Sequence, residues 1–331
     1  MRVCSVLVLG LFLGCQPVSI EPGKAVVEAA APRSEPPGPQ PYVAERAVEG
    51  PVRCVGSDSM EPLMMLWALD FKARHPKSDL ELRCKGSATA PKALLAGETL
   101  LGHMSREMTS EELAAFRAKF GYDPLRIVVA ADALAVYVNA NNPISRLSLP
   151  EVDALFGQQR KGGHPMAVAA WGDLGLSGEW KGREVHPYGR DENSGTRAFF
   201  REHVLRKGEF KEEVKAMADQ FAILEALATD AGGVGYGPIQ HRIGQVRQVP
   251  LVDFGGSEAI PPTPANILSG RYPLYRFLYI YVNKAPGKPL DPGTSEFLRF
   301  ILSKEGQAEV VAFGALPLPA DLLRLNQVRL R

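Results

Sequence analysis

The residues best suited to chemistry in this sequence lie between Arg190 and Thr196, in the run Arg-Asp-Glu-Asn-Ser-Gly-Thr. Ser194, Gly195 and Thr196 precede an expected helix, so their backbone N–H groups and two hydroxyls could donate to a small oxyanion there. Arg190 could add a planar fork of charged donors, with Glu192 holding and partly neutralising the guanidinium. Ser, Gly and Thr are also common in ordinary turns and helix caps. The segment therefore indicates half of an anion-binding site.

The composition limits what such a site could belong to. The chain has 331 residues, 45% of them hydrophobic and 23% charged, which is typical of a globular protein large enough for two domains. Its 38 basic and 37 acidic residues give a net charge of +1, so no overall field favours nucleic acid or an anionic membrane surface. We therefore expect no nucleic-acid partner, and any attraction for an anion must be local.

Two units of the same kind open the folded region. Their strands and helices are expected at residues 52–55, 60–74, 80–84 and 92–95. A small polar turn follows each strand, Gly56-Ser57-Asp58-Ser59 in the first unit and Gly86-Ser87-Ala88-Thr89 in the second. Successive strand–turn–helix units predict an α/β fold with a parallel sheet, in which ligands bind where the strands end. Further helices are expected at 197–206, 222–229, 294–302 and 304–313, and residues 316–331 could add a short terminal helix.

No nucleotide, metal or nucleophile motif accompanies these turns. The chain lacks Gly-x-Gly-x-x-Gly after a strand and Gly-x-x-x-x-Gly-Lys-Ser/Thr, and the glycine-rich segment 232–237 follows a helical stretch, which favours a helix cap and turn. The six histidines show no metal-ligand spacing, although His103 lies near the predicted site and could add a donor. No Gly-x-Ser-x-Gly turn is present. We therefore expect no cofactor, no metal site and no enzymatic activity.

The N-terminus indicates export. Met1-Arg2 precedes an apolar run that ends at Cys15, which is typical of a secretory signal and too short to span a bilayer. The residues before Cys15 resemble a bacterial lipobox, with Phe12 where Leu is usual. We predict a lipoprotein signal peptide at 1–15 with lipidation of Cys15; a cysteine inside an ordinary signal peptide is the alternative. Residues 16–50, rich in Pro, Ala, Glu and Gly, predict an extended tether.

Seven short segments, in this order, carry a resemblance to a known family. They are Gly56–Met60, Gly86–Thr89, Met104–Arg106, Asp132–Asn139, Trp171–Leu174, Arg190–Thr196 and Tyr272–Leu274. Singly they are weak signals, and in this order they are specific. From about Pro51 to Gly314 the chain resembles the phosphate-binding protein of bacterial high-affinity phosphate ABC transporters, in the type II periplasmic binding protein superfamily.

The resemblance implies two α/β lobes, each a mixed sheet flanked by helices, that close on one tetrahedral oxyanion. Lobe 1 would comprise 51–132 and 279–331 and lobe 2 would comprise 133–278, joined by two crossing segments near 131–133 and 277–279. The protein would be an exported monomer, periplasmic or at the cell surface and held at the membrane only by its lipid. It would deliver inorganic phosphate, or a related oxyanion, to the permease of an ABC transporter.

The family's ligands can be carried over by position. Lobe 1 would supply Ser57, Asp58, Ser59 and Ser87, lobe 2 would supply Arg190, Ser194, Gly195 and Thr196, and Glu192 and Arg106 would support them. Relatives usually carry an Asp that accepts the hydrogen of protonated phosphate, and here Leu100 falls at that position. Asp58 could replace it as the acceptor, or it could order its own loop.

Two more departures bear on specificity. Ala88 and Ala90 replace glycines that are common in the family and add bulk where backbone could approach the ligand. Together with Leu100 and the long tether, they leave open a second function: a two-lobed surface lipoprotein with an altered pocket, acting as a sensor, scavenger or interaction domain.

Two cysteines each stand two residues before the Gly of a Gly-Ser turn, on strands expected to be neighbours. Cys54 and Cys84 could approach disulfide distance if their strands matched in register, and export to an oxidising compartment favours pairing. Two buried thiols that pack as small apolar residues are the alternative.

Overall fold

The computed structural model of the protein describes residues 38–330. The predicted signal peptide, Cys15 and most of the predicted tether lie outside this range. Within it, no helix is both long and apolar enough to cross a membrane.

The described residues form alternating strands and helices. The strands are β1 (Gly50–Gly56), β2 (Ser78–Cys84), β3 (Leu101–Met104), β4 (Leu125–Asn139), β5 (Leu147–Ser148), β6 (His186–Arg190), β7 (Lys215–Met217), β8 (Gly233–Pro238), β9 (Val246–Val249), β10 (Leu251–Val252) and β11 (Tyr275–Val282). The helices are α1 (Glu61–Arg74), α2 (Thr89–Ala96), α3 (Ser110–Phe120), α4 (Leu149–Phe156), α5 (Gly195–His203), α6 (Gln220–Thr229), α7 (Pro264–Leu268), α8 (Pro292–Ile301), α9 (Lys304–Phe313) and α10 (Ala320–Leu330). Short 3-10 turns are η1 (Asp58–Met60), η2 (Trp171–Leu174) and η3 (Gly178–Trp180). The predicted strand–helix units and the terminal helix are thus present.

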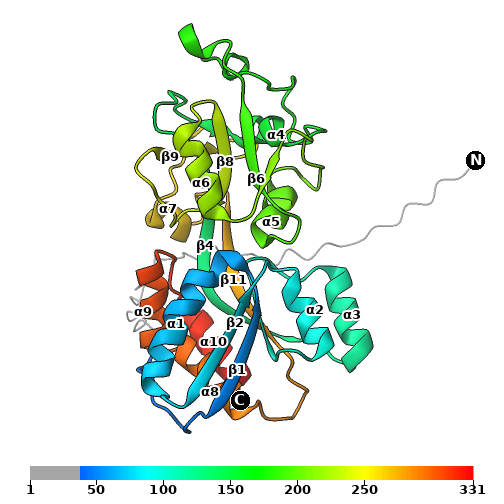
Figure 1. The fold of residues 1–331 in the computed structure, drawn as a ribbon, viewed down its shortest axis with the longest axis vertical. Coiled ribbons are helices and arrows are strands. Elements are labelled where there is room, and N and C mark those ends of the chain that lie inside the picture. The colour runs from blue at the N-terminus through cyan, green and yellow to red at the C-terminus, as the bar shows by residue number, and fades with distance from the viewer. Residues whose placement is uncertain (1–37, 331) are drawn as a thin grey trace, which may run out of the picture. The chain divides into compact units, whose positions relative to one another are not determined.

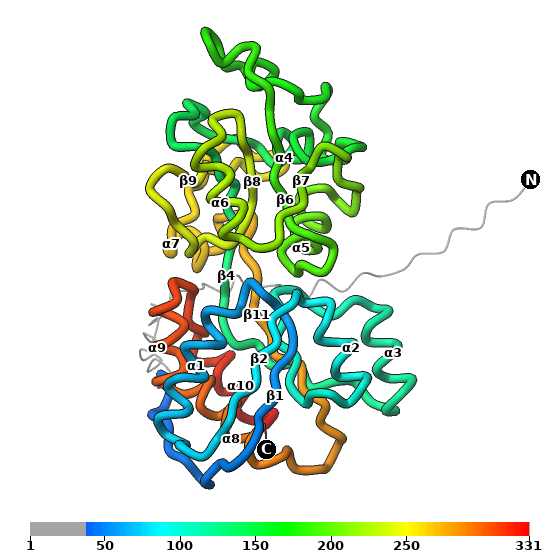
Figure 2. Tube along the Cα trace, in the orientation of Figure 1, coloured from blue at the N-terminus to red at the C-terminus, as the bar shows by residue number. Residues whose placement is uncertain are grey.

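One curled mixed sheet of nine strands runs through the molecule, in the order β2-β1-β3-β11-β4-β8-β6-β7, with β9 also paired to β4. β1 pairs in parallel with both β2 and β3, as the repeated strand–turn–helix pattern predicts. β4 is long enough to pair with β11 over its first part and with β8 and β9 over its second. β4 and β11 are therefore the strands that connect the two ends of the sheet (Figures 1 and 2).

Two separate hydrophobic cores lie at the two ends of this sheet. We call the half with β1–β3, α1–α3 and α8–α10 lobe 1; its core includes Trp67 and Phe297. Lobe 2 contains β5–β10 and α4–α7, with Trp171 and Tyr236 in its core. Along β4 the change from one core to the other falls between Ala130 and Ala131. The fold is thus the two-lobed α/β arrangement, with a mixed sheet flanked by helices, that the sequence predicts.

The glycine-rich segment 232–237 is not a helix cap and turn, as the sequence suggested, but the buried strand β8. Its alternate glycines let α6 lie directly on it: a Cβ at Gly235 would lie 2.6 Å from Ile223, and one at Gly237 would lie 1.9 Å from the amide oxygen of Gln220. The glycine content therefore reflects close packing of a helix on a strand.

The predicted tether is wrong for its last residues, because the chain from 38 onward packs against lobe 1. The backbone N–H of Tyr42 donates to Glu305, and its hydroxyl donates to Glu296 Oε2 at 2.7 Å while contacting His75 Nε2 at 2.7 Å. Val48 is buried in the lobe 1 core. The average composition of the segment concealed these two anchoring side chains.

The predicted disulfide between Cys54 and Cys84 is also wrong, because both are buried and neither is bonded to a cysteine in the part of the chain that the structure describes. In the parallel ladder Cys54 pairs with Leu82 and Cys84 pairs with Gly56, so the cysteines are offset by two residues along neighbouring strands. That offset separates their Cα atoms by more than a disulfide can bridge. Burial raises the pKa of the Cys84 thiol to about 12, which leaves it an unreactive apolar side chain.

Candidate anion-binding site between the lobes

The lobe 2 half of the site is the first turn of α5. Ser194 caps this helix, and its hydroxyl accepts the N–H of Arg197 at 3.3 Å. The N–H groups of a first helical turn have no partner within the helix, and the helix dipole makes this end attractive to anions. A Cβ at Gly195 would lie 2.2 Å from Ser87 Oγ and 2.5 Å from Ser105 Oγ, so only glycine allows the lobe 1 serines to come this close.

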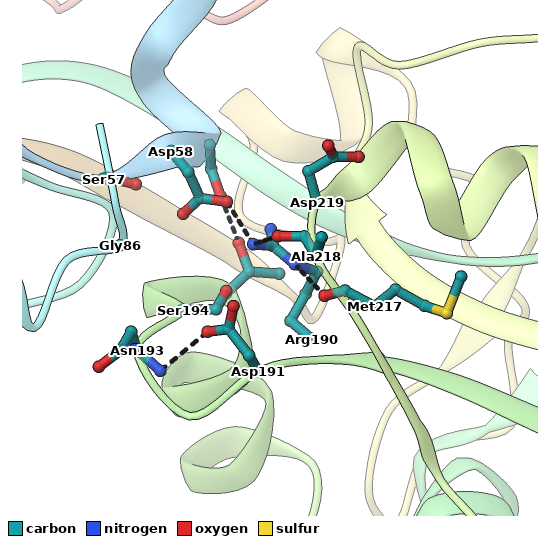
Figure 3. A network of polar contacts seen from close by, with 12 residues as sticks. Ser57, Asp58, Gly86, Arg190, Asp191, Asn193, Ser194, Met217, Ala218 and Asp219 are labelled. Carbon is teal, nitrogen blue, oxygen red and sulfur yellow. Dashed lines mark hydrogen bonds and ion pairs between the residues drawn. The ribbon is translucent and has the colours of Figure 1, made fainter. Parts of the chain in front are cut away.

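Arg190 ends β6 with its guanidinium 2% exposed. Its Nε donates to Met217 O at 3.3 Å and its Nη2 donates to Ala218 O at 2.9 Å. Nη2 also forms an ion pair with Asp58 of lobe 1 (Figure 3). The third nitrogen, Nη1, is buried and has no hydrogen-bond partner among the described residues. One charged donor of Arg190 is therefore fixed in direction and uncommitted.

Glu192 does not hold this guanidinium, contrary to the sequence-based expectation. It is exposed and lines the open side of the cleft, while two backbone carbonyls and Asp58 orient Arg190. Arg106, the other expected supporting residue, forms a bidentate ion pair with Glu112 of α3, with both N–O distances 2.7 Å. Within residues 38–330, neither side chain forms a hydrogen bond or ion pair with a side chain of the candidate site.

The lobe 1 half is a cluster of serines at the ends of the parallel strands. Ser57 Oγ donates to Ser105 Oγ at 3.0 Å, and Ser87 Oγ contacts the same oxygen at 3.2 Å. The backbone N–H of Ser57 donates to His103 O at 2.9 Å, which ties the first turn to β3. Ser59 Oγ reaches across to Thr196 Oγ1 at 2.9 Å. Ser105 was not predicted as a site residue, although it stands inside one of the family-like segments.

Asp58 faces lobe 2 and does not order its own loop. One carboxylate oxygen pairs with Arg190, and the other, Oδ1, is buried without a partner among the described residues. Among the described residues, its side chain therefore has no hydrogen bond to the backbone of η1, the turn in which it stands. Of the two alternatives that the sequence left open, this position favours a carboxylate available to accept a hydrogen from a ligand.

Leu100 does not occupy an acceptor position. It precedes β3 and is 40% exposed, and β3 runs parallel to β1 with His103 opposite Gly56. Leu100 is therefore at the end of the strand remote from Ser57, and the hydrogen-bonding residue that β3 brings to the site is Ser105. The predicted loss of an acceptor at Leu100 is wrong because an exact strand register cannot be read from residue spacing alone.

His103 does not add a cationic donor. Its ring is fully buried, with Nε2 lying 3.4 Å from the Cys84 sulfur and Nδ1 without a partner among the described residues. Burial lowers the pKa of His103 to about 3, so the ring is neutral near pH 7. Elsewhere in residues 38–330, no cluster of His, Cys, Asp and Glu could hold a metal ion.

A buried ion pair between β4 and β11 completes the site, and the sequence analysis missed its role. Arg276 and Asp132 are direct register partners, and Arg276 donates from Nε and Nη2 to Asp132 Oδ2 at 3.0 and 2.8 Å. Its Nη1 donates to Thr196 Oγ1 at 3.1 Å. The available signal was an Arg and an Asp placed within largely apolar strands. Beside the pair, a cleft of about 1140 Å³ opens between α3, α5 and β11.

The arrangement is that of a two-lobed receptor for a small anion, and comparisons with known proteins place it in a family. A model described as the PBP superfamily domain matches residues 36–305. The phosphate-binding protein PstS of Pseudomonas aeruginosa is 42% identical over 281 residues, which cover 85% of this chain and 87% of that protein. The chain belongs to the periplasmic binding protein superfamily.

Solved structures agree with this assignment. A possible phosphate binding protein from Planctomyces limnophilus is 26% identical with a TM-score of 0.62, covering 86% of this chain and 98% of the other. A Clostridium perfringens protein solved with bound phosphate is 25% identical with a TM-score of 0.64, covering 81% of this chain and 99% of the other.

Proposed function

We propose that this protein captures phosphate between its lobes and delivers it to the permease of an ABC transporter. The observation that carries the proposal is a pair of buried, unpartnered atoms, Arg190 Nη1 and Asp58 Oδ1. One is a charged donor and the other an acceptor. Monoprotonated phosphate presents both complementary groups, since it has anionic oxygens and one O–H. The names of the similar proteins support the same ligand.

The proposed ligands come from both lobes. They are Ser57, Asp58, Ser59 and Ser87 from lobe 1 and Arg190, Ser194, Gly195 and Thr196 from lobe 2, with Ser105 added from the geometry. The serine and threonine hydroxyls and the first-turn N–H groups of α5 donate to anionic oxygens, as does Arg190. Asp58 accepts the single hydrogen of the ligand.

The acceptor makes phosphate the preferred oxyanion over sulfate. Sulfate has no hydrogen near neutral pH, so it would leave Asp58 Oδ1 without a partner and facing a like charge. An unmet buried hydrogen bond costs about 1–3 kcal/mol, which corresponds to roughly a tenfold to hundredfold difference in dissociation constant. The alternative function as a sensor, scavenger or interaction domain with an altered pocket rested on Leu100, Ala88, Ala90 and the long tether, and we favour transport because Leu100 lies away from the site.

The cellular setting remains part of the proposal. We place the lobe boundaries at 51–132 with 279–331 and at 133–278, supported by the change of core within β4, and we add the packed segment 38–50 to lobe 1. The protein acts as an exported, lipid-anchored monomer in the periplasm or at the cell surface, attached through Cys15. It binds and releases its ligand unchanged, as a transport component without a cofactor and not as an enzyme.

Titration calorimetry tests the ligand and the acceptor together. Wild type is expected to bind phosphate and to bind sulfate at least tenfold more weakly. Asp58→Asn should weaken phosphate binding and narrow the gap between the two anions, while Asp123→Asn, which changes an exposed carboxylate of lobe 1, should leave both constants unchanged. Absence of phosphate binding by wild type would refute the function, and unchanged discrimination in Asp58→Asn would refute the acceptor role.

A further inference from the structure

Arg276 is a buried cation outside the ligand set proposed above, yet it touches one of those ligands. It lies on β11 opposite Asp132 of β4, close to the point where the two cores meet, and the two side chains are only 2% and 1% exposed. All three guanidinium nitrogens are engaged, two of them with Asp132 and the third with Thr196 Oγ1.

These bonds fix the direction of the Thr196 hydroxyl. A guanidinium can only donate, so Thr196 Oγ1 must accept from Arg276. Its own proton must then point elsewhere, and its other close polar neighbour is Ser59 Oγ at 2.9 Å, on the lobe 1 side of the cleft. The Thr196 hydroxyl therefore points its proton into the space between the lobes. An oxyanion bound there would need such a hydrogen-bond donor.

We propose that Arg276 is a positioning residue that holds the Thr196 hydroxyl as a donor toward the anion and thereby couples the connecting strands to ligand binding. This inference rests on the proposed function, because it assumes an oxyanion at Thr196. A hydroxyl that is already oriented and polarised by a charged donor needs no reorganisation when the anion arrives.

Asp132 fixes the position of the Arg276 guanidinium and neutralises its charge. One of its oxygens accepts both bonds from Arg276, and the other accepts the N–H of Ala133 at 2.7 Å. The guanidinium also lies 5.8 Å from the ring centre of Phe199, on the same helix as Thr196. Arg276 thus ties Thr196, in the first turn of α5, to the connecting strands β4 and β11. Of the two side-chain contacts of Thr196, the one with Ser59 reaches lobe 1.

The test is a double variant, Asp132→Asn with Arg276→Gln, combined with changes at Thr196. Removing both charges avoids leaving one of them buried alone. Loss of a charge-assisted hydrogen bond predicts about a tenfold rise in the phosphate dissociation constant. In a Thr196→Val background, which has no hydroxyl to orient, the same double change should alter the constant by less than about twofold. In a Thr196→Ser background the tenfold effect should return.

A second variant, Arg276→Lys, keeps the positive charge but removes the several N–H groups of the planar guanidinium. Arg276→Lys has a single ammonium that cannot satisfy Asp132 and Thr196 in the same geometry, so its affinity should also fall, again only when residue 196 has a hydroxyl. The matched control is Arg117→Gln with Asp123→Asn, an exposed lobe 1 pair with the same charge change, which should bind phosphate like wild type.

The outcomes separate the inference from the function on which it rests. Suppose that wild type binds phosphate, but that the double change weakens phosphate affinity by the same factor whether residue 196 is threonine or valine. Arg276 then does not act through the hydroxyl, and the inference is overturned. Wild-type affinity in Arg276→Lys would overturn it as well, even where the double variant fails to fold. If wild type binds no phosphate, the proposed function itself falls, and the inference falls with it.

Discussion

A methyl group at position 195 should prevent the lobes from closing without unfolding either of them. In Gly195→Ala the new Cβ would lie 2.2 Å from Ser87 Oγ, 2.5 Å from Ser105 Oγ and 2.9 Å from Ser87 Cβ, whereas ordinary contacts begin near 3.4 Å. The serine cluster must therefore retreat by roughly an ångström, a distance that rotation of one hydroxyl cannot supply, because the Cβ of Ser87 is also too close.

The magnitude follows from the contacts that this retreat removes. Lobe 1 would no longer place Asp58 and Ser87 within hydrogen-bond distance of the anion. Two hydrogen bonds to a charged ligand are worth about 3 kcal/mol together, which is about a hundredfold in dissociation constant. Gly195 has no left-handed backbone angle, so alanine can adopt its conformation. Alanine also favours helix over glycine by up to about 1 kcal/mol, so the Tm should stay the same or rise.

Calorimetry would measure the affinity for phosphate, and thermal unfolding would measure the stability. Small-angle scattering would measure how far the molecule becomes more compact when the ligand binds. Gly182→Ala is the matched control, because a Cβ there meets no atom within 4 Å and should change none of the three. A Gly195→Ala protein that binds phosphate as wild type does would show that the lobes do not close in this geometry. A large fall in Tm would show that position 195 matters for folding and not for closure.

Three further expectations follow from buried polar groups. Cys54 and Cys84 should resist alkylation in the native protein at pH 8 and react only on unfolding, because burial raises both thiol pKa values, and the intact mass should be the same with and without reductant. His103 has a folded-state pKa of about 3, below its unfolded value, so the unfolded chain binds more protons and the free energy of unfolding must fall as pH drops below about 6.5. This residue alone should lower the free energy of unfolding by about 1 kcal/mol between pH 6 and 5. Denaturant titrations of wild type and His103→Gln would measure the difference. Tyr42→Phe should speed proteolysis before residue 50, because it removes the hydroxyl bond to Glu296.

Each of these has an outcome that contradicts it. Rapid alkylation of the folded protein would mean that the thiols are accessible. An equal pH dependence in wild type and His103→Gln would remove that histidine as the cause. Unchanged cleavage in Tyr42→Phe would show that the hydroxyl does not hold the segment 38–49, and Tyr122→Phe, which loses a hydroxyl bond to Asn283 elsewhere in lobe 1, provides the control.

The sequence predicts best what is local in the chain. The half-site from Arg190 to Thr196 is a single strand end, turn and helix start, so its residue types and spacing define its geometry. The parallel pairing of β1 with β2 also followed from a local repeat of strand, turn and helix. In both places the local conformation depends on residues that are close together in the sequence.

The features that the sequence could not predict depend on the register between strands and on contacts between residues far apart in the sequence. A shift of two residues between β1 and β2 separates Cys54 from Cys84, and nothing in either strand alone encodes that shift. Arg276 and Asp132 are 144 positions apart and meet only because β4 and β11 pair at that register. Glu192 is the opposite case: it is close to Arg190 in sequence, but backbone carbonyls from the end of β7 satisfy the guanidinium instead.

The charges of the site bear on how a chain with a net charge of +1 would bind the proposed anion. Each buried arginine has its own carboxylate, Asp58 for Arg190 and Asp132 for Arg276, so the two ion pairs add no net positive charge. Attraction must then come from directed groups: the free Nη1 of Arg190, the first turn of α5 and the oriented hydroxyl of Thr196. In the proposed function, Asp58 and the serines reach the ligand only when lobe 1 is against lobe 2, so recognition of the anion and closure of the cleft would be one event.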